Sequence, residues 1–524
     1  MNRALKSLGF ALVALMITAT AAAAQVTTGN IVGKIVDAQG GVLPGATVVA
    51  THTPTGTSYE GVAGADGAFQ LLNVRVGGPY TVKVTMSGFK DNEIKDLNVK
   101  LGEDAAVSVK LELANVATTV NVVASAATID TNRAGTGGSI SEAVKEALPT
   151  ISRSLFDVVR ANPYFNMYNT AGNGPSSISV AGRNNRYNNV AIDGAVNNDI
   201  FGLAATGTPE GQSGSQPISL DAIAEIQLLV SPYDVRQGGF SGGGINAITK
   251  GGTNAFHGTG FFFGRNQKFV GKGTANIAVS KFDDKQYGGT VGGPIKKNRV
   301  FFFGSFDGQR MNTPSGLSVD STGTKFGNAA AVDTIITQLK NSYGYDPGPN
   351  PTGEFTKIQN NDKYFGRADF NLKTGQQLTI RHNFVDADAD TGTPTSTQFL
   401  LPDNFVRFNI KTHSTVGQLN SAFSKMTNEL RVAVTSVRNR RGGQPFEQKA
   451  FPNFTVTIAP GVTVRGGREV SSTANPPASH ETSGCASVDS RPAAAGASTP
   501  LAQPMRKAVA SSGVRQREPI TTPR

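Results

Sequence analysis

The chain has 524 residues and a formal net charge of +11, with 61 glycines, no tryptophan and a charged fraction of 17%. A mean hydropathy of -0.19 excludes a bundle of membrane-spanning helices, and abundant glycine with modest charge favours short strands and many turns. The middle of the chain shows no basic stripe interleaved with aromatics, so the charge does not indicate nucleic-acid binding. The one cysteine, Cys485, excludes an internal disulfide and a zinc site built on cysteine spacing.

Residues 1–24 have the three parts of a secretory signal peptide. Arg3 and Lys6 give a positive start, residues 8–17 form a short apolar run, and small residues precede Gln25. This order predicts cleavage after Ala24, and the apolar run is too short to span a bilayer. We therefore expect an exported protein.

Residues 27–114 follow the pattern of an all-β sandwich, with turn signals about every eight to twelve residues. Asp66-Gly67 is a strong hairpin signal within this region. The expected strands cover residues 29–36, 46–52, 57–63, 68–74, 80–86 and 106–113.

Four motifs in this region occur in the order typical of one family: Gly41-Val42-Leu43-Pro44-Gly45-Ala46, Asp66-Gly67-Ala68-Phe69, Gly78-Pro79-Tyr80 and Gly88-Phe89. With them the region resembles the carboxypeptidase regulatory-like domain. The resemblance implies a transthyretin-like β-sandwich that carries no catalytic residue. The family is often grouped with carbohydrate-binding-like folds, so sugar binding would rest on fold analogy alone.

Residues 118–125 alternate in a way that suits an exposed strand able to add to the sheet edge of a partner. Its candidate contact residues are Thr119, Val120, Val122 and Val123. In TonB-dependent receptors a segment of this character precedes the plug and pairs with the periplasmic protein TonB. An ordinary linker, or a last strand of the sandwich, explains the same residues equally well.

Residues 129–254 combine one short helix with several strands. Leu155, Val158 and Val159 at helical spacing predict a helix over residues 152–160, and Asn162-Pro163 ends it. Residues 178–183 and 189–194 indicate a strand, a turn and a second strand, and residues 238–250 pass from a glycine-rich run into another strand. In this order the motifs resemble the plug domain of TonB-dependent receptors. The resemblance implies a plug signature at Arg183, Asp193, Gly194, Gly244, Asn246 and Thr249.

The run Gly239-Phe240-Ser241-Gly242-Gly243 also fits a nucleophile elbow, which needs a preceding strand and a following helix. Residues 245–249 predict a strand instead, and no acid–histidine pair is evident. The chain's histidines are scattered, without metal-ligand spacing. We assign no catalytic residue and no cofactor, and we do not expect an enzyme.

From residue 255 to residue 474 the sequence pattern has a period of two. Tight turns on one side and long connections on the other are typical of an outer-membrane barrel. Residues 292–295 and 301–308 are similar to early barrel strands of the Oar-like subfamily of TonB-dependent receptors, which also carries the regulatory-like domain. The expected strands cover residues 256–264, 287–293, 300–307, 365–371, 377–384, 414–423 and 429–437.

These strands number about seven, whereas plugged barrels have about 22. An open sheet edge in lipid is costly because its backbone groups stay unpaired. Residues 475–524 lack aromatic residues and are rich in Pro, Ala, Ser and Arg, which indicates either a disordered tail or a frameshift. We therefore expect a partial barrel that is truncated and inactive alone.

Asp386, Asp388 and Asp390 place oxygen ligands on alternate residues, as at the start of a calcium loop. The pattern departs from an EF-hand, because its glycine falls one place late and Thr397 stands where a glutamate is needed. A solvated loop at the end of a barrel strand is the alternative.

The expected fold is mainly β: a transthyretin-like β-sandwich, an α+β plug domain and a partial antiparallel transmembrane β-barrel in the bacterial outer membrane. The resemblance implies active, TonB-dependent uptake of an unidentified substrate. The expected partners are TonB, outer-membrane lipid and an unknown extracellular ligand, with no nucleic acid. The alternative is an outer-membrane-anchored adhesion or carbohydrate-binding protein.

Overall fold

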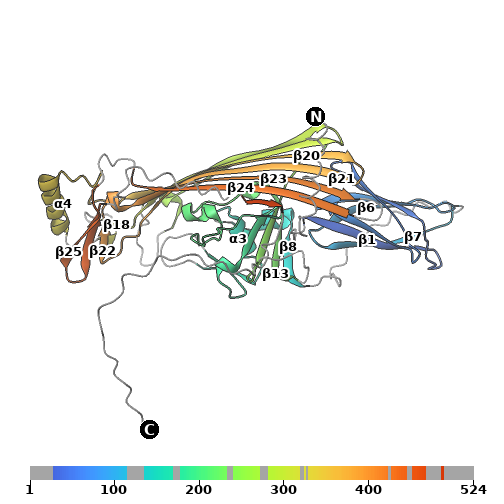
Figure 1. Ribbon diagram of the computed structural model, residues 1–524, viewed down its shortest axis with the longest axis horizontal. Helices are drawn as coiled ribbons and strands as arrows, with labels where there is room; N and C mark the ends of the chain where they lie inside the picture. Colours follow the sequence, from blue (N-terminus) through green and yellow to red (C-terminus); the bar gives the residue numbers. More distant parts are fainter. Residues whose placement is uncertain are drawn as a thin grey trace, which may run out of the picture.

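The computed structural model describes residues 27–114, 135–150, 152–168, 177–232, 240–271, 281–318, 324–325, 329–422, 427–444, 451–467 and 485–488. A long sheet runs the length of the molecule, with a sandwich at one end and a helix-bearing subdomain at the other (Figure 1). A smaller α+β domain lies beneath the middle of the sheet. The predicted signal peptide and the candidate TonB-contact residues (Thr119, Val120, Val122, Val123) lie outside the described residues.

The N-terminal sandwich packs two sheets face to face, with strand orders β4-β1-β7 and β3-β2-β5-β6. Its strands are β1 (Thr28–Asp37), β2 (Thr47–His52), β3 (Thr57–Val62), β4 (Ala68–Arg75), β5 (Gly77–Thr85), β6 (Asn92–Val99) and β7 (Asp104–Leu111). Alternate residues such as Ile31, Val48 and Val82 are fully buried between the sheets. The predicted sandwich is therefore confirmed.

The sequence pattern missed β6. Ile94 and Leu97 are both buried, but three positions separate them instead of two. Asp96 between them has a φ of 59°, and the pairing with β5 shifts register there. Such an irregularity breaks the period-two alternation that predicts a strand.

The central domain contains a five-stranded sheet with the order β12-β11-β14-β13-β8. A separate hairpin pairs β9 with β10, and α3 is held at its start by the Ser154 side chain, which accepts from the Phe156 amide. The helix is shorter than the predicted residues 152–160. The elements are β8 (Gly135–Ile140), α2 (Glu142–Ala147), α3 (Leu155–Val159), β9 (Phe165–Tyr168), β10 (Ser177–Val180), η1 (Asn185–Tyr187), β11 (Asn189–Ile192), β12 (Ala195–Val196), η2 (Pro209–Ser213), η3 (Leu220–Ala222), β13 (Ile223–Pro232) and β14 (Gly244–Thr249).

The long sheet, here called the wall, has eight strands within the described part of the chain. In sheet order they are β15 (His257–Asn266), β16 (Asp283–Lys296), β17 (Val300–Pro314), β20 (Thr356–Lys373), β21 (Gln376–Thr391), β23 (Val406–Ala422), β24 (Thr427–Gly442) and β27 (Cys485–Val488). Each strand pairs antiparallel with its neighbours. The seven expected strands are all present, and most are longer than predicted. The eighth, β27, falls inside the segment expected to be a disordered or frameshifted tail.

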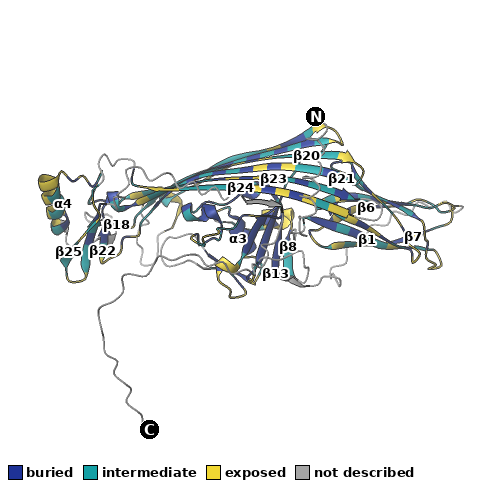
Figure 2. Cartoon of the chain, viewed as in Figure 1, coloured by how far each residue is buried: buried dark blue, intermediate teal, exposed yellow. Residues whose placement is uncertain are grey.

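Side chains alternate across the wall. Along β21, Arg381 and Asn383 are buried and donate hydrogen bonds to the central domain, while Ile380 is 45% exposed on the opposite face. Figure 2 shows the central domain largely buried beneath the wall. Polar residues inside and apolar residues outside are the pattern of an outer-membrane barrel.

The connections at the end of the wall opposite the sandwich form a distal subdomain. It contains α4 (Ala329–Tyr343) and a three-stranded sheet of β22 (Gln398–Leu400), β26 (Val462–Gly466) and β25 (Phe454–Ala459), with η6 (Pro402–Asn404) and the short pair β18 (Leu317–Ser318) and β19 (Thr324–Lys325) nearby. Val332, Tyr345 and Val464 form its small core. The Tyr345 hydroxyl donates to Asp403 at 2.9 Å, and burial raises the pKa of this tyrosine.

Among the residues that the structure describes, no helix is both long and apolar enough to cross a membrane.

Candidate functional site

Asp193 and Gly194 form the tight turn between β11 and β12. Their φ angles are 46° and 71°, and the flanking residues Ile192 and Ala195 pair across the turn. Two consecutive positive φ angles are what a type I′ hairpin requires, and Asp-Gly is one of the sequences that adopt it readily. The Asp193 amide donates to the Ala247 carbonyl at 2.8 Å, which ties the turn to β14.

The neighbouring strand β14 fixes the Asp193 carboxylate. It accepts the Thr249 amide at 2.8 Å and the Thr249 hydroxyl at 2.9 Å, while the Gly194 amide donates to Asn246 at 3.0 Å. Parallel pairing of β11 with β14 brings these residues together. Four of the six predicted signature residues therefore form one cluster.

The other two signature residues lie apart from this cluster. Gly244 pairs with Asn189 at the far end of β14, where an added Cβ would come within 3.1 Å of Phe240 and 3.2 Å of Leu229. Arg183 is exposed in the turn after β10. The structure thus gives Gly244 a packing role and places Arg183 on the surface.

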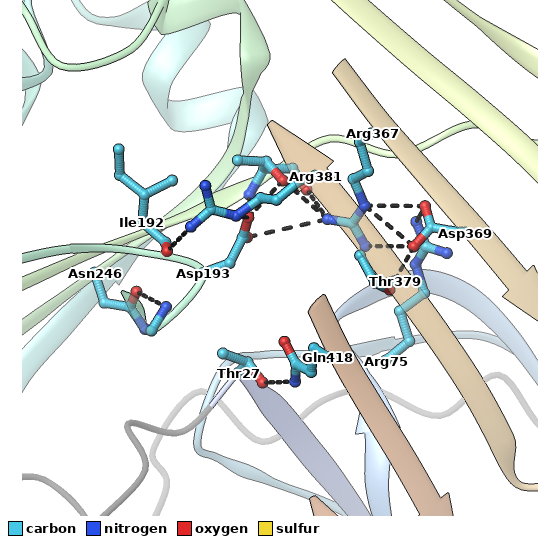
Figure 3. Close-up of polar contacts among 12 residues, drawn as sticks. Thr27, Arg75, Ile192, Asp193, Asn246, Arg367, Asp369, Thr379, Arg381 and Gln418 are labelled. Atoms are coloured by element: carbon cyan, nitrogen blue, oxygen red, sulfur yellow. Dashed lines mark hydrogen bonds and ion pairs between the residues drawn. The ribbon is translucent and has the colours of Figure 1, made fainter. Parts of the chain in front are cut away.

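Two arginines of the wall reach the Asp193 turn from adjacent strands (Figure 3). Arg381 Nε lies 2.8 Å from Asp193 Oδ2, and another nitrogen of Arg381 donates to the Ile192 carbonyl. Arg367 Nη1 lies 4.0 Å from Asp193 Oδ1 and donates to the Thr249 hydroxyl at 2.9 Å and carbonyl at 3.0 Å. Both arginines are almost fully buried.

Arg367 and Arg381 are direct cross-strand neighbours, an arrangement of like charges that is unfavourable by itself. A second buried carboxylate, Asp369, offsets it. Asp369 accepts Arg367 Nε and Nη2 at 2.9 Å each and the Thr379 hydroxyl at 2.7 Å. The arginines are therefore held between one carboxylate of the central domain and one of the wall.

A third arginine explains why position 194 is glycine. Arg431 of β24 donates to the Gly194 carbonyl at 3.2 Å, and it also pairs with Glu429. A Cβ on residue 194 would lie 2.2 Å from Arg431 Nη1. Only glycine combines the positive φ with the close approach of this arginine.

Elsewhere the wall also holds the central domain through polar side chains. Gln359 donates to the Gly214 carbonyl at 3.0 Å, and Asn383 donates to the Pro217 carbonyl at 2.8 Å. The Ser219 hydroxyl donates to Asp307 at 3.0 Å. Beside these polar contacts lies an apolar one, because Phe303 and Phe365 of the wall belong to the same buried cluster as the core of the central domain. Interfaces between domains that include polar contacts of this kind can separate and reform.

Burial shifts the pKa of several groups of the central domain, among them Lys145 and Glu225. Burial lowers the pKa of Lys145 to about 8, with the nearby Lys250 charge acting in the same direction, while its ammonium donates to the Leu220 carbonyl at 3.2 Å. Burial raises the pKa of Glu225, which accepts from Ser139 and from the Leu101 amide of the sandwich. Glu225 therefore lies at the junction of the sandwich and the central domain.

The proposed calcium loop is instead part of strand β21. Asp386 accepts from Lys411 at 2.8 Å, Asp388 accepts from Asn409 at 2.9 Å, and Asp390 accepts from Arg407 at 2.9 Å. The pattern misled because acidic residues on alternate positions of a strand have the spacing of calcium ligands in a loop. Within the described ranges, no group of three or more His, Cys, Asp or Glu side chains could hold a metal ion.

The structure also argues against a nucleophile elbow. Ser241 is followed by strand β14 rather than by a helix, and its amide donates to the Tyr187 carbonyl at 3.3 Å.

The residues that sequence reasoning missed are the partners of Asp193 in the wall. Each is a lone arginine on the inward face of a period-two strand, and that inward placement is the signal that could have marked them.

Comparison with known families agrees with this geometry. Residues 30–112 match the carboxypeptidase regulatory-like domain, and residues 248–495 match an outer membrane beta barrel domain. The chain is therefore an outer-membrane protein in which a regulatory-like sandwich precedes a β-barrel domain. It is a homologue of the TonB-dependent transporter Oar of Myxococcus xanthus, with 25% identity over 419 residues.

That match covers 76% of this chain and 36% of the relative, so the chain spans about a third of the relative's length. Among solved structures, the outer membrane transporter YddB from Escherichia coli is 14% identical, with a TM-score of 0.45 over 64% of this chain and 42% of that one. The siderophore receptor PirA from Pseudomonas aeruginosa is 13% identical, with a TM-score of 0.38 over 59% and 42%.

Proposed function

We propose that these domains serve a TonB-dependent transporter that actively moves a substrate across the outer membrane, with the central domain as its plug. The observation that supports this proposal is the set of contacts that the wall makes with the Asp193 turn. Arg381, Arg367 and Arg431 contact a single turn of the central domain from three strands of the wall. A plug needs such a hold, which keeps the pore closed until energy is supplied.

The polar character of this hold suits a domain that must move. Ion pairs and hydrogen bonds to backbone carbonyls can be exchanged for water when the domain leaves, whereas a large apolar core cannot. TonB would pull on residues 118–125, and the first described element after them is β8, the edge strand of the central sheet. The pull would reach β13 next, because β8 pairs with it.

No step of this mechanism makes or breaks a covalent bond, so the proposed protein is a transporter and not an enzyme. The distal subdomain lies at the end of the wall opposite the sandwich, which would be the outer side of the membrane (Figure 1). An extracellular ligand would meet that subdomain first.

An energy-dependence experiment tests the proposal without a known substrate. In a Cys485→Ser background, Ala433→Cys places a reporter on the inner face of the wall, where Ala433 is 7% exposed and clusters with Ala195 of the central domain. We expect N-ethylmaleimide to label it faster in energised cells than in cells treated with a protonophore. Deleting residues 118–125 should abolish the difference.

If labelling depends neither on energy nor on residues 118–125, active transport is rejected. The outcome would then favour the alternative of an outer-membrane-anchored adhesion or carbohydrate-binding protein, which needs no moving plug.

A further inference from the structure

The sandwich is seated directly on the end of the wall where the tight turns lie. The Pro54 carbonyl accepts the Asn254 amide at 2.7 Å, and the Ser58 carbonyl accepts the Gly375 amide at 3.3 Å. Between these two points, a Cβ on Gly56 would lie 3.3 Å from the Cβ of Asn298, in the β16–β17 turn. The sandwich thus follows the rim of the wall from the start of β15 to the β20–β21 turn.

One residue of the sandwich reaches past this rim. Arg75 ends β4, and two buried tyrosines fix its backbone: its amide donates to the Tyr59 hydroxyl at 3.1 Å, and its carbonyl accepts the Tyr80 hydroxyl at 2.6 Å. Tyr80 in turn packs on His52, with ring centroids 4.9 Å apart. The core of the sandwich therefore sets the position of Arg75.

The Arg75 side chain joins the sandwich to the buried charge cluster of the wall. Its Nη2 lies 3.9 Å from Asp369 Oδ2, and the two side chains are 14% and 0% exposed. Gly251 leaves the space for this approach, because a Cβ there would lie 2.4 Å from Arg75 Nη2 and 2.7 Å from Asp369 Oδ2. Asp369 also binds Arg367, and Arg367 donates to Thr249 of the central domain. A continuous series of polar contacts therefore connects all three domains (Figure 3).

Two further residues of the sandwich, Leu101 and Thr27, contact the central domain and the wall. The Leu101 amide donates to Glu225, and the Leu101 carbonyl accepts from Gln227, both at 3.4 Å. Thr27 accepts from Gln418 at 2.6 Å and from Arg431 at 3.2 Å. Arg431 is the residue that also holds the Gly194 carbonyl.

We propose that the regulatory-like sandwich is a clamp that keeps the central domain seated in the wall, and that Arg75 is its connecting residue. The sandwich must then undock before the central domain can leave. The contacts named above are polar, and a cavity of about 10 Å³ with Tyr59, Gln377 and Ser421 in its lining lies between the sandwich and the wall. Such an interface can open and close. The sandwich then has a role of its own, separate from transport itself.

Cysteine accessibility in the purified protein tests the clamp without energy or substrate. Two reporters are placed singly in the Cys485→Ser background. Ser421→Cys lies in the cavity between sandwich and wall, and Ala433→Cys lies between wall and central domain. Arg75→Gln should raise the N-ethylmaleimide labelling rate at both reporters at least about tenfold, because it leaves the buried Asp369 without one of its cations.

Lys83→Gln is the matched control, since Lys83 is 54% exposed and pairs with Asp91 on the free surface of the sandwich. Gly251→Ala is the second test variant: it pushes Arg75 and Asp369 apart and leaves the sandwich core untouched, so the proposal stays testable if Arg75→Gln fails to fold. Equal labelling of test and control variants at Ala433→Cys would overturn the clamp, even with faster labelling at Ser421→Cys. A failure of energy dependence in cells would reject transport and leave this result standing.

Discussion

Asp193 and Arg381 form an ion pair of 2.8 Å across the boundary between the central domain and the wall. The carboxylate sits on a hairpin turn with left-handed backbone, and the guanidinium projects inward from the middle of β21. The pair is almost completely buried, because the Arg381 and Asp193 side chains are 1% and 10% exposed. The seating of the central domain therefore depends strongly on this contact.

We expect Asp193→Asn to destabilise the chain by about 3–5 kcal/mol, because Arg381 and Arg367 would lose their shared anion inside a buried site. The measurement is the urea midpoint in detergent micelles. Asp91→Asn is the control, since Asp91 belongs to an exposed pair and should change the midpoint little. Equal midpoints for the two variants would show that Asp193 does not anchor the turn.

The variant Gly194→Ala introduces two sources of destabilisation at one position, backbone strain and a steric clash. An alanine there must adopt a φ of 71°, and its Cβ would collide with Arg431. Gly182→Ala is the matched control, because its φ is 78° and nothing lies within 4 Å of its added Cβ. We expect about 1–2 kcal/mol for the control from backbone strain alone, and a clearly larger loss of stability for Gly194→Ala. Similar losses would mean that Arg431 moves aside without cost.

The sequence predicted the wall strands because apolar residues alternate wherever one face meets lipid. The sequence underestimated the length of these strands, because their end parts lack this alternation. Strand β20 starts at Thr356, whereas the alternation becomes visible only near Phe365, since most of the earlier residues are polar on both faces of the strand. The distal subdomain was missed because its core residues come from three separate connections and show no local period.

The Asp193 turn was predictable, and its partners were not. Asp-Gly after a strand has a local signature, and four of the six residues that the family resemblance named lie together around the turn. Arg367, Arg381 and Arg431 acquire meaning only from the tertiary arrangement that brings three strands of the wall around one turn. The same holds for Arg75, which directly follows the expected strand of residues 68–74.

His52 makes the stability of the sandwich depend on pH. Burial lowers its pKa from 6.5 to about 3, with the charge of Arg75 acting in the same direction. The unfolded chain therefore binds more protons between these two values, so stability falls as the pH drops through this window, by at most about 1.4 kcal/mol per pH unit. Hydrogen exchange of the sandwich strands, corrected for intrinsic rates, should show weaker protection at pH 5 than at pH 7.

The variant His52→Gln isolates this effect, because glutamine can still contact Thr55, which lies 2.7 Å from His52 Nδ1, but it does not titrate. Its protection should vary less with pH than that of the parent chain. The same pH dependence in both proteins would assign the effect to other groups.

A disulfide across the rim gives the sharpest check on where the sandwich sits. The expected Cβ–Cβ separation between residues 56 and 298 is 3.3 Å, close to the range of about 3.5–4.5 Å found in disulfides. In the Cys485→Ser background, Gly56→Cys with Asn298→Cys should therefore cross-link on mild oxidation and shift in a non-reducing gel.

Gly56→Cys with Lys297→Cys is the matched control, because Lys297 is the exposed neighbour in the same turn. If the control pair forms as fast as the test pair, the sandwich has no fixed seat on the wall. A selective cross-link shows instead that the docked position is populated, and adding Arg75→Gln to the test pair should then slow its formation, because the undocked sandwich carries residue 56 away from the turn.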